Sequence, residues 1–239
     1  LQQLPVEQGQ IMLVPDYICE VVLKPLEDLG IRPMFYPVDD NFAPDWKVLE
    51  VLQSNESVHA FLLVHYFGQP QDIERAKKFC NQHKLWLIED NAHGYGGKLN
   101  GRLLGSFGDV GISSPQKQLS ILSGGILFMN GKQINPSPEY LQKYPLFKKI
   151  NSLRSFFRKY PAIKKKIRKL VRTKPDFNNP RSFPEVRMGY YLADYKSTKL
   201  ILAKNWTTHA ENRREVWRDW SRITIEYGFR PVWKEPHPE

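Results

Sequence analysis

The chain has 239 residues, of which 41% are hydrophobic and 25% charged, and its formal net charge at pH 7 is +10. This length is enough for one large domain, or for one domain and part of a second, with a buried core. No apolar run approaches the roughly 20 residues that span a bilayer, and the first residues do not resemble a signal peptide, so we expect a cytoplasmic protein. The two cysteines predict neither a disulfide framework nor a metal site.

Apolar runs alternate with helix-like segments along the first half of the chain. The runs occupy residues 11–14, 34–38, 60–66, 85–88, 110–113 and 126–129. Between them, residues 44–53 and 71–83 have apolar side chains at helical spacing and a proline near the start. This rhythm is typical of βαβ units. We predict an α/β domain over residues 1–131, with a largely parallel sheet and helices on both of its faces.

An acidic side chain comes directly after the fourth apolar run. Residues 85–88 are apolar, and residues 89–93 have the sequence Glu-Asp-Asn-Ala-His. Because open α/β sheets bind ligands at the carboxyl ends of their strands, we interpret Asp90 as a ligand-binding carboxylate. The alternative is a helix cap, since an aspartate before small residues often begins the next helix.

A lysine and two serines lie at and beyond the end of the fifth run. Ser113 and Ser114 are followed by Lys117 and, further on, by a glycine pair at 124–125. Few charges surround Lys117, so we expect it to point inward, where desolvation would lower its pKa and make it a stronger nucleophile. A solvated loop lysine is the alternative. The glycine pair is either a turn or a place where a ligand approaches the backbone.

Together these side chains match the needs of one cofactor, pyridoxal phosphate. A carboxylate keeps its ring nitrogen protonated, an amine bonds covalently to its aldehyde, and hydroxyl groups bind its phosphate. Asp90, Lys117 and the serines at 113 and 114 supply this set. His93 comes three residues after Asp90, and we interpret it as a further contact of the cofactor. For His65, the more common outcome is a core histidine whose ring nitrogens have partners inside the protein.

After Gly131 the composition shifts toward proline, aromatic and basic residues. We predict a helical, basic region over residues 132–239 that includes part of a small domain and a long helix at 188–227. Residues 158–174 contain nine basic side chains and no acidic one. This run has three interpretations: a solvated helix face, an electrostatic funnel for a nucleotide substrate, or a surface for a membrane or a nucleic acid. We expect the solvated face, and no nucleic-acid partner, because no aromatic platform accompanies the charges.

The order of these motifs resembles the DegT/DnrJ/EryC1/StrS family of sugar aminotransferases, which has the type I fold of pyridoxal-phosphate-dependent transferases. The resemblance is carried by Leu13-Val14-Pro15, residues 30–39, residues 65–70 with Asp72, residues 89–93, Lys117 with Gly124-Gly125, and Arg187-Met188. It implies that Lys117 bonds to the cofactor and that Asp90 pairs with the pyridine nitrogen. It also places His93 near the phenolic oxygen and gives the phosphate to Ser113 or Ser114.

The same resemblance implies an activity. An amino group would pass from an amino acid donor such as glutamate to a nucleotide-linked keto sugar, in a homodimer whose active site lies at the subunit interface. Family members are longer, so the chain is expected to be a shortened one. Two alternatives remain open: a related sugar dehydratase, in which histidine replaces the lysine, and an inactive fragment that binds a polyanion or a membrane through residues 158–174.

Overall fold

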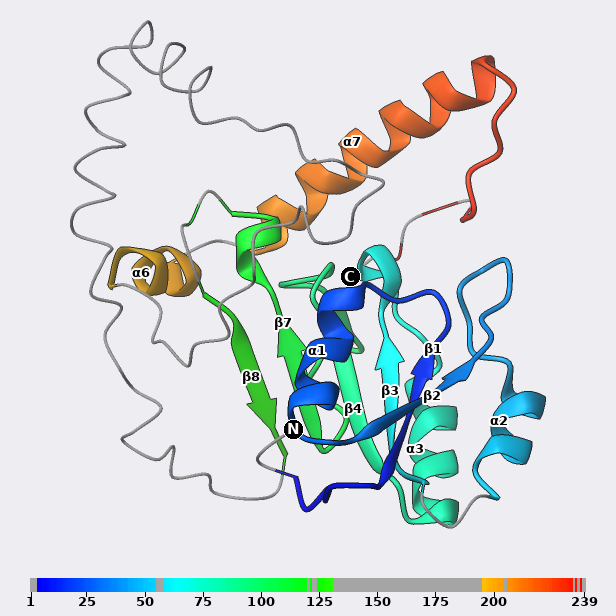
Figure 1. Ribbon diagram of the computed structural model, residues 1–239. Helices are drawn as coiled ribbons and strands as arrows, with labels where there is room; N and C mark the ends of the chain where they lie inside the picture. Colours follow the sequence, from blue (N-terminus) through cyan, green and yellow to red (C-terminus); the bar gives the residue numbers. More distant parts are fainter. Residues whose placement is uncertain are drawn as a thin grey trace, which may run out of the picture. The chain divides into compact units, whose positions relative to one another are not determined.

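The computed structural model describes residues 4–54, 58–119, 121, 124–130, 195–203, 206–233, 235 and 237. Its centre is a six-stranded sheet with the order β2-β1-β3-β4-β7-β8 (Figure 1). The strands are β1 (Ile11–Pro15), β2 (Arg32–Tyr36), β3 (Val58–Val64), β4 (Trp86–Asn91), β7 (Val110–Ser113) and β8 (Ile126–Met129). All neighbours are parallel except β7 and β8, which are antiparallel. The predicted largely parallel sheet is therefore confirmed.

Each predicted strand is present, but some boundaries differ. The runs predicted at 34–38 and 60–66 begin and end two residues earlier, as β2 and β3. The strand predicted at 85–88 continues to Asn91, because Asp90 and Asn91 pair with Ile112 and Ser113 of β7. Asp90 thus lies within β4, close to its carboxyl end.

Two of the predicted helices are present, and each begins two residues later than predicted. In α2 (Trp46–Leu52) the side chain of Asp45 accepts the N–H groups of the first turn, and in α3 (Ile73–His83) Asp72 does the same. A third helix, α1 (Glu20–Asp28), was not predicted. It contains a proline at residue 25 and has a cysteine at its N-cap that makes no side-chain hydrogen bond, so its sequence lacks the usual N-cap and is interrupted by a helix breaker.

Helices cover both faces of the sheet. Leu49 of α2 and Phe79 of α3 pack with Leu13, Leu63 and Leu87 in one hydrophobic cluster. In the second cluster, Leu26 of α1 packs with Val14, Val64 and Ile88, and Figure 1 shows α1 on the opposite side of the sheet from α3. Neighbouring residues of a strand alternate between faces. By this alternation, Glu89 lies on the face of α2 and α3, and Asp90 lies on the face of α1.

A short hairpin lies in the connection after β4. It is formed by β5 (Lys98–Leu99) and β6 (Arg102–Leu103), which pair antiparallel. The turn residues Asn100 and Gly101 both have positive φ, 52° and 76°. Asn-Gly is the preferred sequence for a two-residue hairpin turn of this kind, so the sequence contained a signal for the hairpin.

The predicted long helix at 188–227 consists of two helices where it is described, α6 (Tyr195–Ala203) and α7 (Trp206–Glu226). Contacts group Leu1–Asn135 with Tyr195–Glu239 in one compact unit, and Pro136–Asp194 forms a second unit. The predictions for the basic run 158–174, for Arg187-Met188 and for a domain boundary at 131 fall on residues outside the described ranges, and they stay predictions. None of the helices described is long and apolar enough to cross a membrane.

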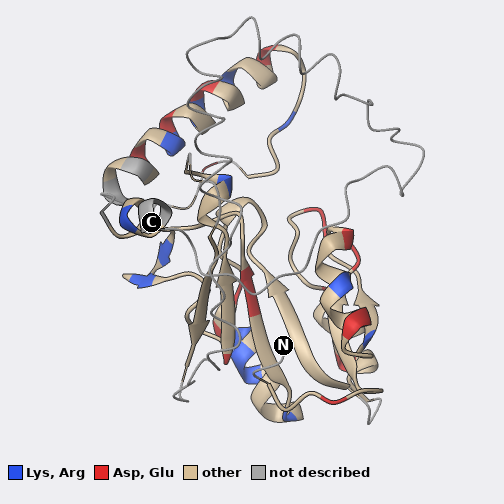
Figure 2. Cartoon of the chain, turned by 60° about the vertical axis from the view of Figure 1, so that its left-hand side comes forward, with Lys and Arg blue, Asp and Glu red and all other residues tan. Residues whose placement is uncertain are grey.

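Charged residues are mostly absent from the sheet. Figure 2 shows Lys, Arg, Asp and Glu mainly on the helices and connections, while the strands are largely uncharged. A red stretch interrupts the sheet because β4 carries Glu89 and Asp90 side by side. Both side chains are nearly inaccessible, with exposed fractions of 0% and 6%. A buried carboxylate is costly unless hydrogen bonds or an opposite charge compensate it, so we expect such partners around both residues.

Candidate functional site

The carboxyl ends of β3, β4 and β7 meet at one edge of the sheet. Val64 of β3 is opposite Asp90 of β4, and Asn91 of β4 is opposite Ser113 of β7. The backbone N–H of His65 also donates to the carbonyl oxygen of Asp90 at 2.9 Å. The residues that follow these strands therefore collect at a single edge, where parallel α/β sheets bind their ligands.

Asp90 brings a nearly buried carboxylate to this edge. Its Oδ1 accepts the backbone N–H of Ala92 at 2.8 Å. No helix of the described chain begins here, so the helix-cap alternative is wrong. The carboxylate also acts on Tyr66, whose hydroxyl pKa is raised first by burial and further by the charges of Asp16 and Asp90. With Oδ1 held by the backbone, Oδ2 is the oxygen that a ligand can engage.

His93 connects the end of β4 to the loop after β3. Its Nδ1 accepts the backbone N–H of Phe67 at 3.3 Å, and the two rings are stacked at 5.6 Å between centroids. Burial lowers the pKa of His93, the charge of Lys117 lowers it further, and the charge of Asp90 raises it. The ring is therefore neutral at pH 7, and its proton is on Nε2 because Nδ1 is an acceptor.

Lys117 ends a 3-10 turn, η2 (Pro115–Lys117), that follows β7. Its side chain is exposed, so the expectation of an inward-pointing lysine is wrong. The reason is local: the turn, closed by a hydrogen bond of 3.1 Å from the N–H of Lys117 to the carbonyl of Ser114, carries residue 117 past the edge of the sheet. The ammonium still acts electrostatically on His93, as does Asp90. The three predicted residues therefore lie around one site.

The two serines differ in their surroundings. Ser113 is buried, with 4% of its surface exposed, and Ser114 is half-buried just beyond the strand. Two buried side-chain atoms of the described chain lack a hydrogen-bond partner, Ser113 Oγ and Asn91 Oδ1, and both are on the paired residues at the ends of β7 and β4. By strand alternation, Ser113 lies on the opposite face from Asp90. A ligand that contacts both must lie over the edge of the sheet.

Glu89 and His65 form a buried pair that holds this edge together. His65 Nε2 lies 2.9 Å from Glu89 Oε2, and the N–H of Gln71 donates to His65 Nδ1 at 3.1 Å. Nδ1 is thus an acceptor, and Nε2 carries the proton that it donates to Glu89. Both ring nitrogens have partners inside the protein, which confirms the interpretation of His65 as a core histidine.

The carboxylate of Glu89 also fastens the loop that follows the hairpin. It accepts the backbone N–H of Gly105 at 3.2 Å, and those of Phe107 and Gly108. Burial raises the pKa of Glu89, but the hydrogen bond and charge of His65 and these backbone donors outweigh it, so the pKa lies below its ordinary value. The sequence analysis missed this role. A glutamate inside an otherwise apolar strand was the available signal.

Replacing Glu89 with glutamine should destabilise the fold by roughly 3 kcal/mol, because a neutral amide weakens several charge-assisted bonds and points an NH₂ group at other donors. Since the pKa of Glu89 is lowered in the folded state, its ionised form stabilises the protein above the unfolded-state pKa of about 4.3, and this contribution is lost as the pH falls through the folded-state value. Urea denaturation at pH 7 and in acid measures both effects.

The difference in stability between the wild type and Glu89→Gln should therefore shrink on acidification. Glu74→Gln is the matched control, because Glu74 is exposed in the first turn of α3 and its loss should cost under about 1 kcal/mol. Equal stability of the two variants at pH 7 would contradict the role given to Glu89.

The loops after β3 and β4 touch each other through glycines. A Cβ atom on Gly94 would lie 2.5 Å from the Cα of Gly68, so any larger residue would push the two loops apart. Of the predicted glycine pair, Gly124 has φ of 131°, a conformation that only glycine adopts readily. At least this member of the pair has a structural reason to be glycine.

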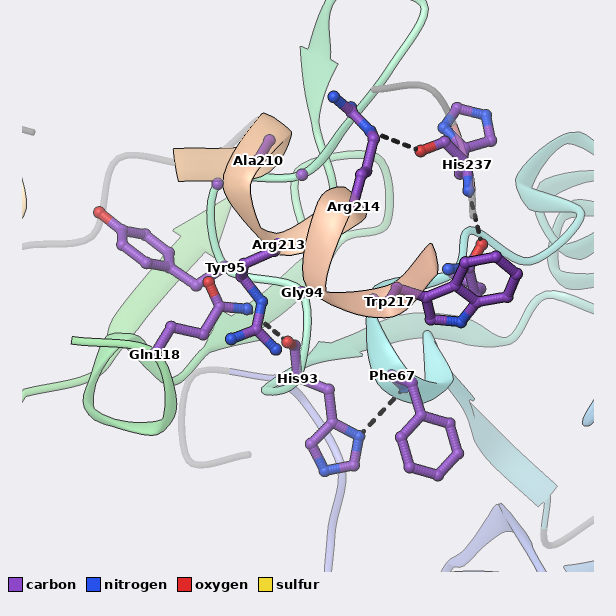
Figure 3. A pocket seen from close by; sticks show the side chains of 14 residues that line it. Phe67, His93, Gly94, Tyr95, Gln118, Ala210, Arg213, Arg214, Trp217 and His237 are labelled. Atoms are coloured by element: carbon purple, nitrogen blue, oxygen red, sulfur yellow. Dashed lines mark hydrogen bonds between the residues drawn. The ribbon is translucent and has the colours of Figure 1, made fainter. Parts of the chain in front are cut away.

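A pocket of about 150 Å³ opens beside His93. Its walls are residues 67–69 after β3, residues 93–97 after β4, Gln118, four residues of α7 and His237 (Figure 3). Gln118, which directly follows Lys117, donates its amide to the carbonyl of His93 at 2.5 Å. The pocket therefore adjoins the site of Asp90 and Lys117. The sequence analysis did not identify Phe67, Gln118 or the α7 residues as part of it.

Residues 1–170 match the DegT/DnrJ/EryC1/StrS aminotransferase family. The chain therefore belongs to this family, as its motifs predict. Its mostly parallel α/β sheet agrees with the type I fold expected for the family.

Among curated proteins, the chain is similar to GDP-perosamine synthase of Vibrio cholerae, with 29% identity over 133 residues, 54% of this chain and 36% of the relative. It is also similar to UDP-N-acetyl-3-dehydro-alpha-D-glucosamine 3-aminotransferase of Acidithiobacillus ferrooxidans, with 30% identity over 127 residues, 52% of this chain and 34% of the relative. Two further relatives are named as sugar dehydratases. The chain thus spans about a third of the length of the curated relatives it matches.

A solved structure of a DegT DnrJ EryC1 StrS aminotransferase from Brucella abortus is similar over 53% of this chain and 36% of that chain, with 26% identity and a TM-score of 0.48.

Proposed function

We propose that this protein is a pyridoxal-phosphate-dependent aminotransferase that transfers an amino group from an amino acid, such as glutamate, to a nucleotide-linked keto sugar. The observation that carries the proposal is the gathering of Asp90, His93 and Lys117 at one edge of the sheet, where the pKa of His93 responds to the charges of both neighbours. Membership of the family supports it, and so does the similarity to a relative named as a sugar 3-aminotransferase.

The residues at this edge fit pyridoxal phosphate. Asp90 Oδ2 would accept a hydrogen bond from the protonated ring nitrogen, and the exposed amine of Lys117 would condense with the aldehyde, with loss of water. Ser113 Oγ is buried without a partner in the described chain, and a phosphate oxygen would satisfy it, with Ser114 as the second hydroxyl. His93, with its proton on Nε2, would donate to the phenolic oxygen.

The proposed chemistry assigns each residue one task. When bound, pyridoxal phosphate supplies an electron sink for the negative charge that remains when a proton leaves the donor's α-carbon. Asp90 would keep the ring nitrogen protonated, because a nearly buried carboxylate favours a cation beside it. Lys117 Nζ, when its amine is free, would accept the proton from the donor's α-carbon as a general base. His93 and the serines orient the cofactor.

A sugar dehydratase on the same scaffold is the second candidate, since relatives with that name exist. In that branch of the family, histidine is expected in place of the lysine. Lys117 therefore favours transamination. The sugar, the nucleotide and the position that receives the amino group are open in both cases.

Borohydride reduction tests the assignment of the cofactor. We expect the protein incubated with pyridoxal phosphate to be yellow, and to lose this colour on reduction with a covalent mass increase on the peptide that contains Lys117. Reduction without a mass increase at Lys117 would contradict the proposal. The inactive fragment that binds a polyanion or a membrane through residues 158–174 predicts that outcome.

We also propose a homodimer with the active site at the subunit interface and a cytoplasmic location, both on the basis of the family. Analytical ultracentrifugation of the full chain with and without pyridoxal phosphate tests the first of these. A monomer under both conditions would contradict it.

A further inference from the structure

The pocket beside His93 is lined by basic and aromatic side chains. Two arginines of α7, Arg213 and Arg214, lie in its wall with His237, and Trp217 and Phe67 supply aromatic surfaces. Among the described residues that line it, none is an aspartate or a glutamate. A pocket with guanidinium groups and no acidic side chain favours an anionic ligand.

The two arginines have different roles. Arg214 Nε donates to the carbonyl oxygen of His237 at 3.1 Å, and the N–H of His237 donates to Gln69 Oε1 at 3.0 Å. His237 thus links Arg214 of α7 to Gln69 in the loop after β3. Arg213 is exposed and has no hydrogen-bond or ion-pair partner among the described residues.

Figure 3 shows that the side chain of Arg213 extends from α7 toward Gln118 and His93, while Arg214 extends toward His237. Gln118 and His93 lie next to Lys117 and Asp90, so the guanidinium of Arg213 is directed to the border between the pocket and the proposed cofactor site. An anion bound by Arg213 would lie beside the reacting group of a substrate at Lys117.

The choice of anion follows from the shape and charge of the pocket. Its volume of about 150 Å³ is suited to a small charged group, not to a whole nucleotide sugar. Arginine presents a planar fork of donors that binds phosphate oxygens in a bidentate manner. Trp217 and Phe67 in the pocket wall offer aromatic surfaces on which a base stacks. A diphosphate group satisfies the volume and the charge of the pocket, and a nucleoside attached to it would lie against the aromatic side chains.

We propose that this pocket binds the diphosphate of the nucleotide-linked sugar, with Arg213 as the residue that contacts it. The proposal rests on the proposed function, because it assigns the nucleotide part of that substrate. It names a specificity-determining residue on α7, far from Lys117 in the sequence.

Isothermal titration of the full chain, loaded with pyridoxal phosphate, with GDP, UDP and inorganic pyrophosphate tests the proposal. We expect Arg213→Gln to weaken the binding of the nucleoside diphosphates at least tenfold, and the loss to shrink at high salt. The affinity of Arg213→Lys should lie between those of the wild type and Arg213→Gln, because lysine keeps the charge but not the fork of donors. Arg218→Gln is the control, since Arg218 is exposed on the same helix and does not line the pocket.

Three results would overturn the inference: equal affinity of the wild type and Arg213→Gln for GDP and UDP, an equal loss in Arg218→Gln, or a loss of binding of L-glutamate alone. The last would assign the pocket to the carboxylate of the amino donor. The outcome is separate from that of the proposed function, which depends on attachment at Lys117. Covalent attachment of the cofactor at Lys117 without an effect of Arg213→Gln would contradict only the assignment of the pocket. Diphosphate binding without attachment at Lys117 would contradict only the proposed aminotransferase.

Discussion

Replacing Lys117 with alanine is expected to abolish covalent attachment of pyridoxal phosphate and, with it, transamination. The amine is the only group of this residue that the proposed chemistry needs, because it would serve as both the covalent link and the base. The fold should be unaffected, because the side chain is exposed and its removal should change the free energy of unfolding by less than about 0.5 kcal/mol. Mass spectrometry after borohydride reduction measures attachment, and thermal denaturation measures stability.

Lys98→Ala is the matched control, because Lys98 is also an exposed lysine, on the hairpin after β4. It should keep both attachment and turnover. A second measurement tests the geometry without the cofactor: since the charge of Lys117 lowers the pKa of His93, Lys117→Ala should raise that pKa in NMR titrations. Turnover at the wild-type rate in Lys117→Ala would contradict the assignment of the lysine.

The position of Asp90 could be predicted from the sequence. An apolar run that ends in an acidic side chain marks the carboxyl end of a buried parallel strand, and β4 ends in this way beside β3 and β7. The apolar pattern does not predict which residue ends the strand. That depends on the hydrogen bonds that Asp90 and Asn91 share with β7, and pairing partners are not encoded in local periodicity.

Other features of the site depend on contacts between distant segments. The exposure of Lys117 results from the turn after β7, and a lack of nearby charges in the sequence does not imply burial. Glu89 acquires its role from loop N–H groups at residues 105–108, which the sequence does not place beside it. Arg213 is more than ninety residues from Lys117 in the chain, and only the folded structure brings α7 to the pocket.

Asp90→Asn is expected to keep covalent attachment of the cofactor while slowing the removal of the donor's α-proton by roughly 100-fold or more, because a neutral amide no longer stabilises the charged ring nitrogen. The substitution is nearly isosteric, and the amide oxygen can still accept the N–H of Ala92 that Oδ1 accepts now at 2.8 Å. Loss of the local structure therefore cannot account for a slow reaction. Single-turnover absorbance after mixing with L-glutamate measures the rate of this step directly.

Asp109→Asn is the control for the loss of one negative charge from the same sheet. Asp109 Oδ2 accepts the backbone N–H of Leu87 at 2.8 Å, and Asp109 immediately precedes β7, so it lies at the opposite edge from Asp90. Its amide should leave the single-turnover rate unchanged. If Asp90→Asn reacted at the wild-type rate, another group would have to hold the proton on the ring nitrogen. If both variants were slowed equally, the cause would be a disturbed sheet and not the charge at the cofactor, since only Asp90 lies at the edge where Lys117 and His93 gather.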